Sequence, residues 1–176
     1  MPTKILAILL DCGDTLIDEG TEVKDENGAT LSADLIPGAA QALLALKASG
    51  YRLGLVADGP ELTFRNELAQ HNLARIFDCY AISELLGCEK PDRRMFEHAL
   101  HQLGILPGDY ARVVMVGNNL SRDIKGANEL GLISVWIDWA PRRAKVPADA
   151  SEAPRYTIQN PADLPALIAS LEEATA

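Results

Sequence analysis

Short, nearly unbroken apolar runs alternate along this chain with longer segments whose apolar residues recur at helical spacing. Strands of a parallel sheet read as continuous apolar runs, because helices bury both faces of the sheet. The alternation therefore predicts βαβ units, and right-handed crossovers combine them into a doubly wound, mostly parallel, Rossmann-like α/β sheet. The expected strands are Ile5–Leu10, Arg52–Ala57, Cys79–Ile82, Arg112–Val116 and Ile133–Ile137, with a short sixth at Tyr156–Ile158.

Turn and capping residues mark the helices expected between these strands. Proline favours helix entrances and glycine follows helix ends, and Pro37, Pro60 and Gly131 stand at such places. Asp92 and Ser121 are the expected N-caps. No repeat or linker interrupts the sequence, so a single domain over residues 1–176 is expected. The predicted helices are Gly38–Ala48, Pro60–His71, Asp92–Leu103, Ser121–Leu130 and Ala162 to about Glu173.

The segment between Leu16 and Pro37 has no helical periodicity. Its Asn27-Gly28 pair, flanked by short polar strand candidates, is the strongest short signal for a β-hairpin. We expect a hairpin at about residues 19–34, inserted after the first strand. Ligands of open α/β sheets bind outside the carboxyl ends of the strands, so this hairpin should form an exposed flap over the site.

The acidic composition narrows the choice of partners. The 176 residues include 25 acidic and 16 basic ones, for a net charge of −9, and nucleic-acid binding needs clustered Lys and Arg. No apolar run approaches the roughly 20 residues of a membrane span, and Met1–Leu10 lacks a cleavage-site composition. Cys12, Cys79 and Cys88 have no paired spacing, which favours a reducing compartment. We expect a cytoplasmic protein with no nucleic-acid or membrane partner.

Polar residues follow several of the predicted strands, at the point where each strand ends. Carboxyl ends of parallel strands meet at one edge of a sheet, so these side chains should lie close together. Oxygen ligands with room for water and phosphate are what Mg²⁺ prefers, and the helix after Gly59 adds amides that favour an anion. Each residue alone could be a turn or helix-terminal residue, but their common position favours a site. The residues are Asp11, Asp14, Lys90, Asn118 and Asp123.

These motifs, in this order, resemble those of the haloacid dehalogenase (HAD) superfamily, and the resemblance runs from Ile5 to the last helix. The family's first motif is Asp-x-Asp-Gly-Thr-Leu after an apolar strand, and residues 11–16 read Asp-Cys-Gly-Asp-Thr-Leu. The third is Lys-Pro-Asp, which stands at residues 90–92. The fourth is Val-Gly-Asp-Ser-x-x-x-Asp, and residues 116–123 read Val-Gly-Asn-Asn-Leu-Ser-Arg-Asp.

The resemblance implies a chemistry and a set of site residues. In this superfamily the first aspartate, here Asp11, attacks phosphorus and forms an aspartyl-phosphate that water then hydrolyses. Mg²⁺ and a lysine, here Lys90, neutralise the charge of the phosphoryl group. The implied metal ligands are Asp11, Gly13 through its carbonyl, Asn118 and Asp123. The implied phosphate contacts are Ala57, Asp58, Gly59 and Lys90.

Three positions depart from the family pattern. Gly13 replaces the aspartate that acts as general acid, a role worth roughly 10² to 10⁴ in rate. Asp14, the next residue with a carboxyl, is the candidate to take over this catalytic role. Ala57 lacks the hydroxyl that usually binds the phosphoryl group, which leaves only the backbone amides that follow it. Asn118 keeps an oxygen ligand where the family has an aspartate but loses the charge.

The leading functional prediction is a Mg²⁺-dependent phosphomonoester hydrolase acting through Asp11 on a phosphorylated substrate. Many members of the superfamily insert a large cap after the first motif, whereas the segment between Leu16 and Pro37 has room only for the hairpin. The resemblance is therefore to capless members, which act on larger phosphorylated molecules or borrow a neighbouring subunit as a lid, so a homo-oligomer is also considered. The alternative is a catalytically weakened HAD-like domain that binds a phosphorylated ligand or a protein partner. A dehalogenase is less favoured because it needs a closed apolar pocket. A signalling receiver domain is also less favoured, because it carries its acceptor aspartate on a later strand, whereas Asp11 follows the first strand.

Overall fold

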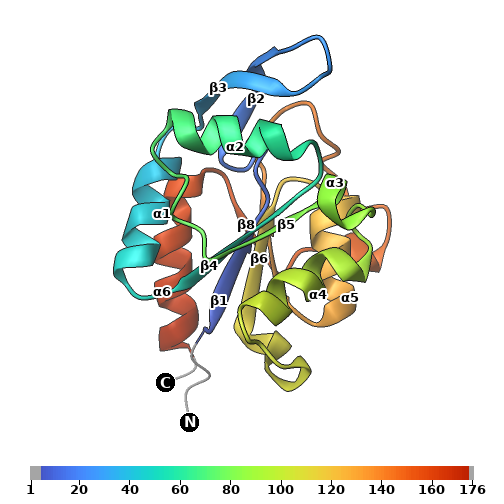
Figure 1. The fold of residues 1–176 in the computed structure, drawn as a ribbon. Coiled ribbons are helices and arrows are strands. Elements are labelled where there is room, and N and C mark those ends of the chain that lie inside the picture. The colour runs from blue at the N-terminus through green and yellow to red at the C-terminus, as the bar shows by residue number, and fades with distance from the viewer. Residues whose placement is uncertain (1–4, 175–176) are drawn as a thin grey trace.

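A six-stranded sheet forms the centre of the molecule, and helices cover both of its faces (Figure 1). The computed structural model describes residues 5–174, so the two ends of the predicted domain, residues 1–4 and 175–176, lie outside the described part. Every strand pair in this sheet is parallel, in the order β5-β4-β1-β6-β7-β8. The strands are β1 (Ala7–Leu10), β4 (Arg52–Ala57), β5 (Cys79–Ile82), β6 (Val113–Gly117), β7 (Ile133–Ile137) and β8 (Tyr156–Ile158).

The helices form two layers, with α1 and α6 against one face of the sheet and α4 and α5 against the other (Figure 1). Each sequence-predicted helix is present, which confirms the doubly wound α/β fold. The α-helices are α1 (Ala39–Ala48), α2 (Glu61–Gln70), α3 (Ser83–Leu86), α4 (Arg93–Gln102), α5 (Lys125–Leu130) and α6 (Leu164–Glu173). Short turns of 3₁₀ or π type are η1 (Pro107–Arg112), η2 (Leu120–Ile124), η3 (Ala150–Glu152) and η4 (Pro161–Asp163).

Alternate residues of β1 face opposite layers of helices. Ile8 and Leu10 belong to the core beneath α1 and α6, whereas Ala7 and Leu9 belong to the core beneath α4. None of the four is more than 1% exposed. Burial of an isoleucine or leucine side chain contributes roughly 1.5–3 kcal/mol, so this strand is stabilised from both sides. The unbroken apolar run in the sequence reflects a strand with no solvent-facing side.

The predicted hairpin forms between β1 and α1 and pairs β2 (Ile17–Lys24) with β3 (Thr30–Leu35). Its turn contains Gly28 at φ 84°, and its tip lies at the end of the molecule beyond the sheet (Figure 1). The β3 strand is anchored to α2, because the Thr30 N–H donates to Thr63 Oγ1 at 2.9 Å and the Ala33 N–H donates to Gln70 Oε1 at 3.0 Å. The flap is therefore exposed at its tip and held in place along β3.

One of the two predicted helix caps is wrong. Asp92 does cap α4, because its side chain accepts a hydrogen bond from the Arg94 N–H. At the next helix, Asn119 takes the role expected of Ser121, accepting from the N–H groups of Ser121 and Arg122. The chain passes through the π turn η2 before α5 begins, so the cap lies two residues earlier than the sequence suggested. Among residues 5–174, no helix combines the length and apolar character needed to cross a membrane.

Candidate active site

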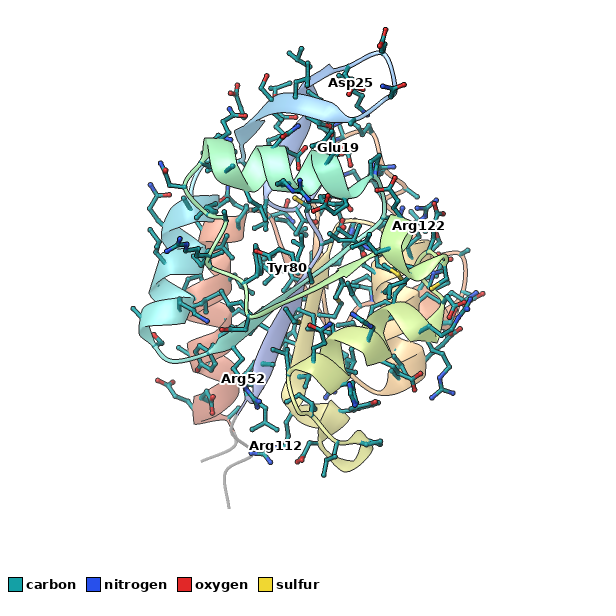
Figure 2. The ribbon with its side chains drawn as sticks, viewed as in Figure 1. Glu19, Asp25, Arg52, Tyr80, Arg112 and Arg122 are labelled. Atoms are coloured by element: carbon teal, nitrogen blue, oxygen red, sulfur yellow. The ribbon has the colours of Figure 1, made fainter. Side chains whose placement is uncertain are left out.

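A cavity of about 180 Å³ lies at the carboxyl ends of the central strands, beneath the β2–β3 hairpin. Figure 2 shows Glu19 and Arg122 at this end of the molecule, whereas Arg52 and Arg112 lie at the opposite end of the sheet. The loops after β1, β4 and β6 and the segment before α4 all contribute to it, as the strand-end argument predicts. The sequence-predicted residues that line it are Asp11, Gly13, Asp58, Gly59, Lys90, Asn118 and Asp123.

Asp11 and Asp123 are positioned by the ends of two neighbouring strands. The Asp11 N–H donates to Val116 O at 3.0 Å, which fixes the end of β1 against β6. Asp123 lies over the end of β6, where a Cβ on Gly117 would lie 2.2 Å from its Cγ. The Asn119 N–H holds the other side of this carboxylate, donating to Oδ2 at 2.9 Å. Glycine at position 117 is therefore what lets this carboxylate approach the strand end.

Lys90 connects the two aspartates. Its buried Nζ lies 2.7 Å from Asp11 Oδ1 and 2.8 Å from Asp123 Oδ1. It also donates to Val56 O at 2.8 Å, so the carbonyl at the end of β4 orients the ammonium group. Asp11 and Asp123 are therefore close enough to share one cation.

The carboxylates outnumber the cation that they surround. Burial alone would lower the pKa of Lys90, but the charges of Asp11 and Asp123 raise it above its usual value. Burial, and then the charge of Asp11, raise the pKa of Asp123 despite its contact with Lys90. Burial also raises the pKa of Asp58. Because burial is the first cause of the raised pKa values of Asp123 and Asp58, a further cation beside these carboxylates would favour their ionised forms.

The donor set fits a hard cation such as Mg²⁺. Asn118 Nδ2 is buried without a hydrogen-bond partner among residues 5–174, and Asp123 Oδ1 has the ionic contact with Lys90 Nζ at 2.8 Å but no well-aligned hydrogen bond in that range. A half-turn of the Asn118 amide would present its oxygen at that place instead. No group of three His, Cys, Asp or Glu side chains in the described part has metal-binding geometry, so two carboxylates would act with amide and main-chain oxygens. Asp11, Asn118, Asp123 and the carbonyl of Gly13 are the residues that could hold the ion.

The loop after β4 is less free to bind an anion than the sequence suggested. The Gly59 N–H donates to Ser83 Oγ at 2.8 Å, and Ala57 is fully buried in the core. Asp58 accepts from the Lys90 N–H at 3.0 Å and from Arg122 Nη1 at 3.1 Å. Arg122 lines the cavity and was not predicted. Its position in the fourth motif, one residue before Asp123, was the available signal.

Asp14 is a predicted site residue that the structure does not bring to the cavity. It is fully buried at φ 51°, and its Oδ1 accepts from Arg142 Nη1 at 2.8 Å and from the Glu19 N–H at 3.2 Å. Arg143 Nε lies 3.8 Å from the other oxygen. The assignment of Asp14 as a catalytic residue is therefore corrected: its carboxylate joins the base of the hairpin to the loop after β7.

Three carboxyl groups outside the sequence motifs line the cavity, those of Glu19, Glu22 and Glu67. Glu19, on β2, lies over Gly13, and burial raises its pKa. Glu67, on α2, is 1% exposed and accepts from Cys12 Sγ at 3.4 Å, and burial raises its pKa to about 7. The hairpin and α2 enclose this side of the cavity, and neither segment contains a family motif. The sequence offered only an indirect indication of Glu19: glycine at position 13 leaves a space that another side chain has to fill.

The parallel α/β sheet, with an aspartate–lysine–aspartate cluster at its strand ends, defines a Rossmann-like α/β domain. A family model described as haloacid dehalogenase-like hydrolase matches residues 10–131. The chain belongs to this hydrolase family. It is 31% identical to the glyceraldehyde 3-phosphate phosphatase of Pyrococcus furiosus over 78% of this chain and 54% of that one. It is 34% identical to the N-acylneuraminate-9-phosphatase of Mus musculus over 69% of this chain and 47% of that one.

Solved structures share the same fold. A HAD phosphatase from Thermococcus onnurineus superposes with a TM-score of 0.75 over 93% of this chain and 97% of that chain, at 19% identity. A 2-haloacid dehalogenase from Pseudomonas syringae superposes with a TM-score of 0.64 over 78% of this chain and 54% of that chain, at 28% identity. The chain spans about half the length of the curated relatives that it matches.

Proposed function

We propose that this protein is a Mg²⁺-dependent phosphomonoester hydrolase that forms an aspartyl-phosphate on Asp11. The observation that carries the proposal is the contact of Lys90 Nζ with both Asp11 and Asp123, at 2.7 and 2.8 Å, on the wall of an open cavity. A nucleophilic carboxylate must be held in place while charge on the phosphoryl group is neutralised, and this cluster can do both. Relatives named as phosphatases, at 31% and 34% identity, support the same reaction.

The residues of this chain would divide the work as follows. Asp11, the Gly13 carbonyl, Asn118 and Asp123 would hold Mg²⁺, which would supply charge neutralisation for the phosphoryl oxygens. Asp11 would attack phosphorus, the ester oxygen would leave, and water would then cleave the aspartyl-phosphate to release inorganic phosphate. Lys90, oriented by Val56 O, would hold the phosphoryl group together with the main-chain amide of Asp58. Arg122, beside Asp58, supplies a second cation near the mouth of the cavity.

The size and polarity of the cavity support a small phosphorylated substrate. Its volume of about 180 Å³ is below the roughly 300–1,000 Å³ of pockets for drug-sized ligands. Glu19, Glu22, Lys24 and Glu67 line the part beneath the hairpin, so the leaving group would meet hydrogen-bonding side chains. We propose a phosphate ester of a small hydroxylated compound, the class to which glyceraldehyde 3-phosphate, named for one set of relatives, belongs.

The setting and assembly of the protein are proposed on separate grounds. Cys12, Cys79 and Cys88 are all free, which supports the reducing cytoplasm. The net charge of −9 favours a small phosphoester over a nucleic acid. A homo-oligomer stays a prediction, and light scattering on the purified chain would test it.

The test is hydrolysis of a panel of phosphomonoesters with and without Mg²⁺. The wild type should release inorganic phosphate only with the metal, and Asp11→Asn should release none. Acid quenching during turnover should trap a phosphoryl group on the peptide that contains Asp11. Equal, negligible release by the wild type and Asp11→Asn at saturating Mg²⁺ would overturn the proposal.

A second candidate is a HAD-like domain that binds a phosphorylated ligand without efficient turnover. The observations that favour it lie in the loop after β4, where Ala57 has no hydroxyl and the Gly59 N–H is taken by Ser83. Calorimetry that measures binding of inorganic phosphate in the presence of Mg²⁺ distinguishes the two candidate functions. Binding by a wild type that hydrolyses no ester would favour this candidate.

A further inference from the structure

Gly13 leaves a space beside Asp11 that the side chain of Glu19 fills. A Cβ on Gly13 would lie 2.0 Å from Glu19 Oε1, 2.8 Å from its Cδ and 2.9 Å from its Cγ. Gly13 is not among the glycines with positive φ, so its backbone could accept another residue. The carboxyl of Glu19 thus occupies the volume that a side chain at position 13 would take, so a larger residue there would have to displace it.

Contacts on two sides hold Glu19 in this place. Its N–H donates to Asp14 Oδ1 at 3.2 Å, which fixes the start of β2. Arg143 Nη2 lies 2.7 Å from Oε2, whereas Oε1 is the oxygen nearest Gly13. Arg142 bonds Asp14 and Asp18, so the loop after β7 secures the base of the hairpin. Oε2 of Glu19 is therefore held by Arg143, and Oε1 is directed toward Gly13.

The other carboxyl groups near the cavity have different partners. Asp14 is buried against Arg142. Glu22 pairs with Lys24 at 2.9 Å, and Glu67 accepts from the thiol of Cys12. Asp123 lies against Lys90. Glu19 is therefore the cavity residue whose carboxyl lies at position 13, where the family has an aspartate and this chain has glycine.

We propose that Glu19 is a catalytic residue that donates the proton to the leaving oxygen, in place of the acid that Gly13 lacks; this rests on the proposed function. As Asp11 bonds to phosphorus and the ester P–O bond breaks, the proton of the Glu19 carboxyl passes to the leaving oxygen, which departs as an alcohol. The Glu19 carboxylate then takes a proton from the water that attacks the aspartyl-phosphate. Cleavage of its P–O bond regenerates Asp11 and releases inorganic phosphate, so the protons balance over one cycle.

The test compares esters whose leaving groups differ in their need for a proton. β-Glycerophosphate has a strongly basic alkoxide leaving group, and dinitrophenyl phosphate has a weakly basic phenolate. Glu19→Gln, which is isosteric and keeps a group that can contact Arg143, should lower kcat/KM for the alkyl ester by about 10²-fold or more. For the aryl ester the loss should stay within about threefold, because its leaving group departs without protonation. This aryl activity also reports that the variant is folded.

Asp18→Asn is the matched control. Asp18 is another β2 carboxylate that contacts an arginine, Arg142, but it does not line the cavity. Its substitution should leave the alkyl-to-aryl ratio of kcat/KM unchanged. A ratio that falls as far in Asp18→Asn as in Glu19→Gln would overturn the proposal, because the hairpin's attachment would then explain the effect.

A rescue experiment tests the space argument directly. The double variant Gly13→Asp/Glu19→Ala places a carboxyl at position 13 and removes the side chain that blocks it. It should hydrolyse the alkyl ester at least about tenfold faster than Glu19→Ala alone, as expected when a general acid is restored. A double variant no faster than Glu19→Ala would overturn the assignment.

Failure of this proposal is distinguishable from failure of the proposed function. If the wild type hydrolyses both esters, Asp11→Asn hydrolyses neither, and Glu19→Gln lowers both equally at an unchanged melting temperature, only the role of Glu19 is overturned. If the wild type hydrolyses neither ester with Mg²⁺, the proposed function and the role of Glu19 are both overturned.

Discussion

Arg142 Nη1 lies 2.8 Å from Oδ1 of the fully buried Asp14, although 128 residues separate the two in sequence. The contact joins the loop after β7 to the base of the β2–β3 hairpin. A buried carboxylate that loses its partner is an uncompensated charge, which is strongly destabilising. The position of the hairpin over the cavity therefore depends on the second half of the chain.

Arg142→Ala should lower the free energy of unfolding by about 1–3 kcal/mol, less than for a fully buried pair because the arginine is partly exposed. Urea denaturation at neutral pH measures the change. Asp14→Asn/Arg142→Ala should recover part of it, since no buried charge then remains. A double variant less stable than Arg142→Ala would contradict this account.

Glu67 should make stability depend on pH. Burial raises its pKa from 4.5 to about 7, so between these values the folded chain binds more protons than the unfolded chain. The stability linked to this group is present below pH 4.5 and is lost as pH rises to about 7. Relative to Glu67→Gln, the wild type should lose up to about 3 kcal/mol of unfolding free energy across that interval. Parallel pH curves for the two proteins would show that Glu67 titrates normally.

Restoring a carboxylate at position 118 should tighten Mg²⁺ binding. The Asn118 amide supplies an oxygen without charge, and charge count tunes the affinity of oxygen sites for divalent ions. Asn118→Asp should lower the Mg²⁺ dissociation constant roughly tenfold, equivalent to about 1.4 kcal/mol. Isothermal titration with MgCl₂ measures it. Asp123→Asn should act in the opposite direction, and equal affinities in all three proteins would place the ion elsewhere.

Gly126 allows α5 to pack against α4. A Cβ there would lie 2.3 Å from Phe96 Cε2 and 2.4 Å from its Cζ, and Phe96 is fully buried. Gly126→Ala should therefore destabilise the fold by about 1–3 kcal/mol, as overpacking of a core does. Gly108→Ala is the control, because a Cβ at that position meets nothing within 4 Å. Thermal unfolding of the two variants compares them, and equal melting temperatures would contradict the packing argument.

The periodicity of the sequence was sufficient for the fold. The bounds of β4 and β7 match the predicted ones, since a strand covered on both faces is mostly apolar. Strand ends likewise predicted that Asp11, Lys90 and Asp123 would meet, because parallel topology brings these loops to one edge. The α3 helix was missed, since four residues are too short to show a helical period.

Side-chain directions and contacts between distant segments could not be predicted from the sequence. Asp14 lies in the first motif and Glu19 follows that motif by three residues, yet only Glu19 reaches the space over Gly13. That outcome depends on where the hairpin lies, and the hairpin is held by Thr63 of α2 and by arginines after β7. Local patterns encode strands, turns and which loops share an edge. Which carboxyl enters the cavity was decided by contacts between distant segments, which form only when the chain is packed in three dimensions.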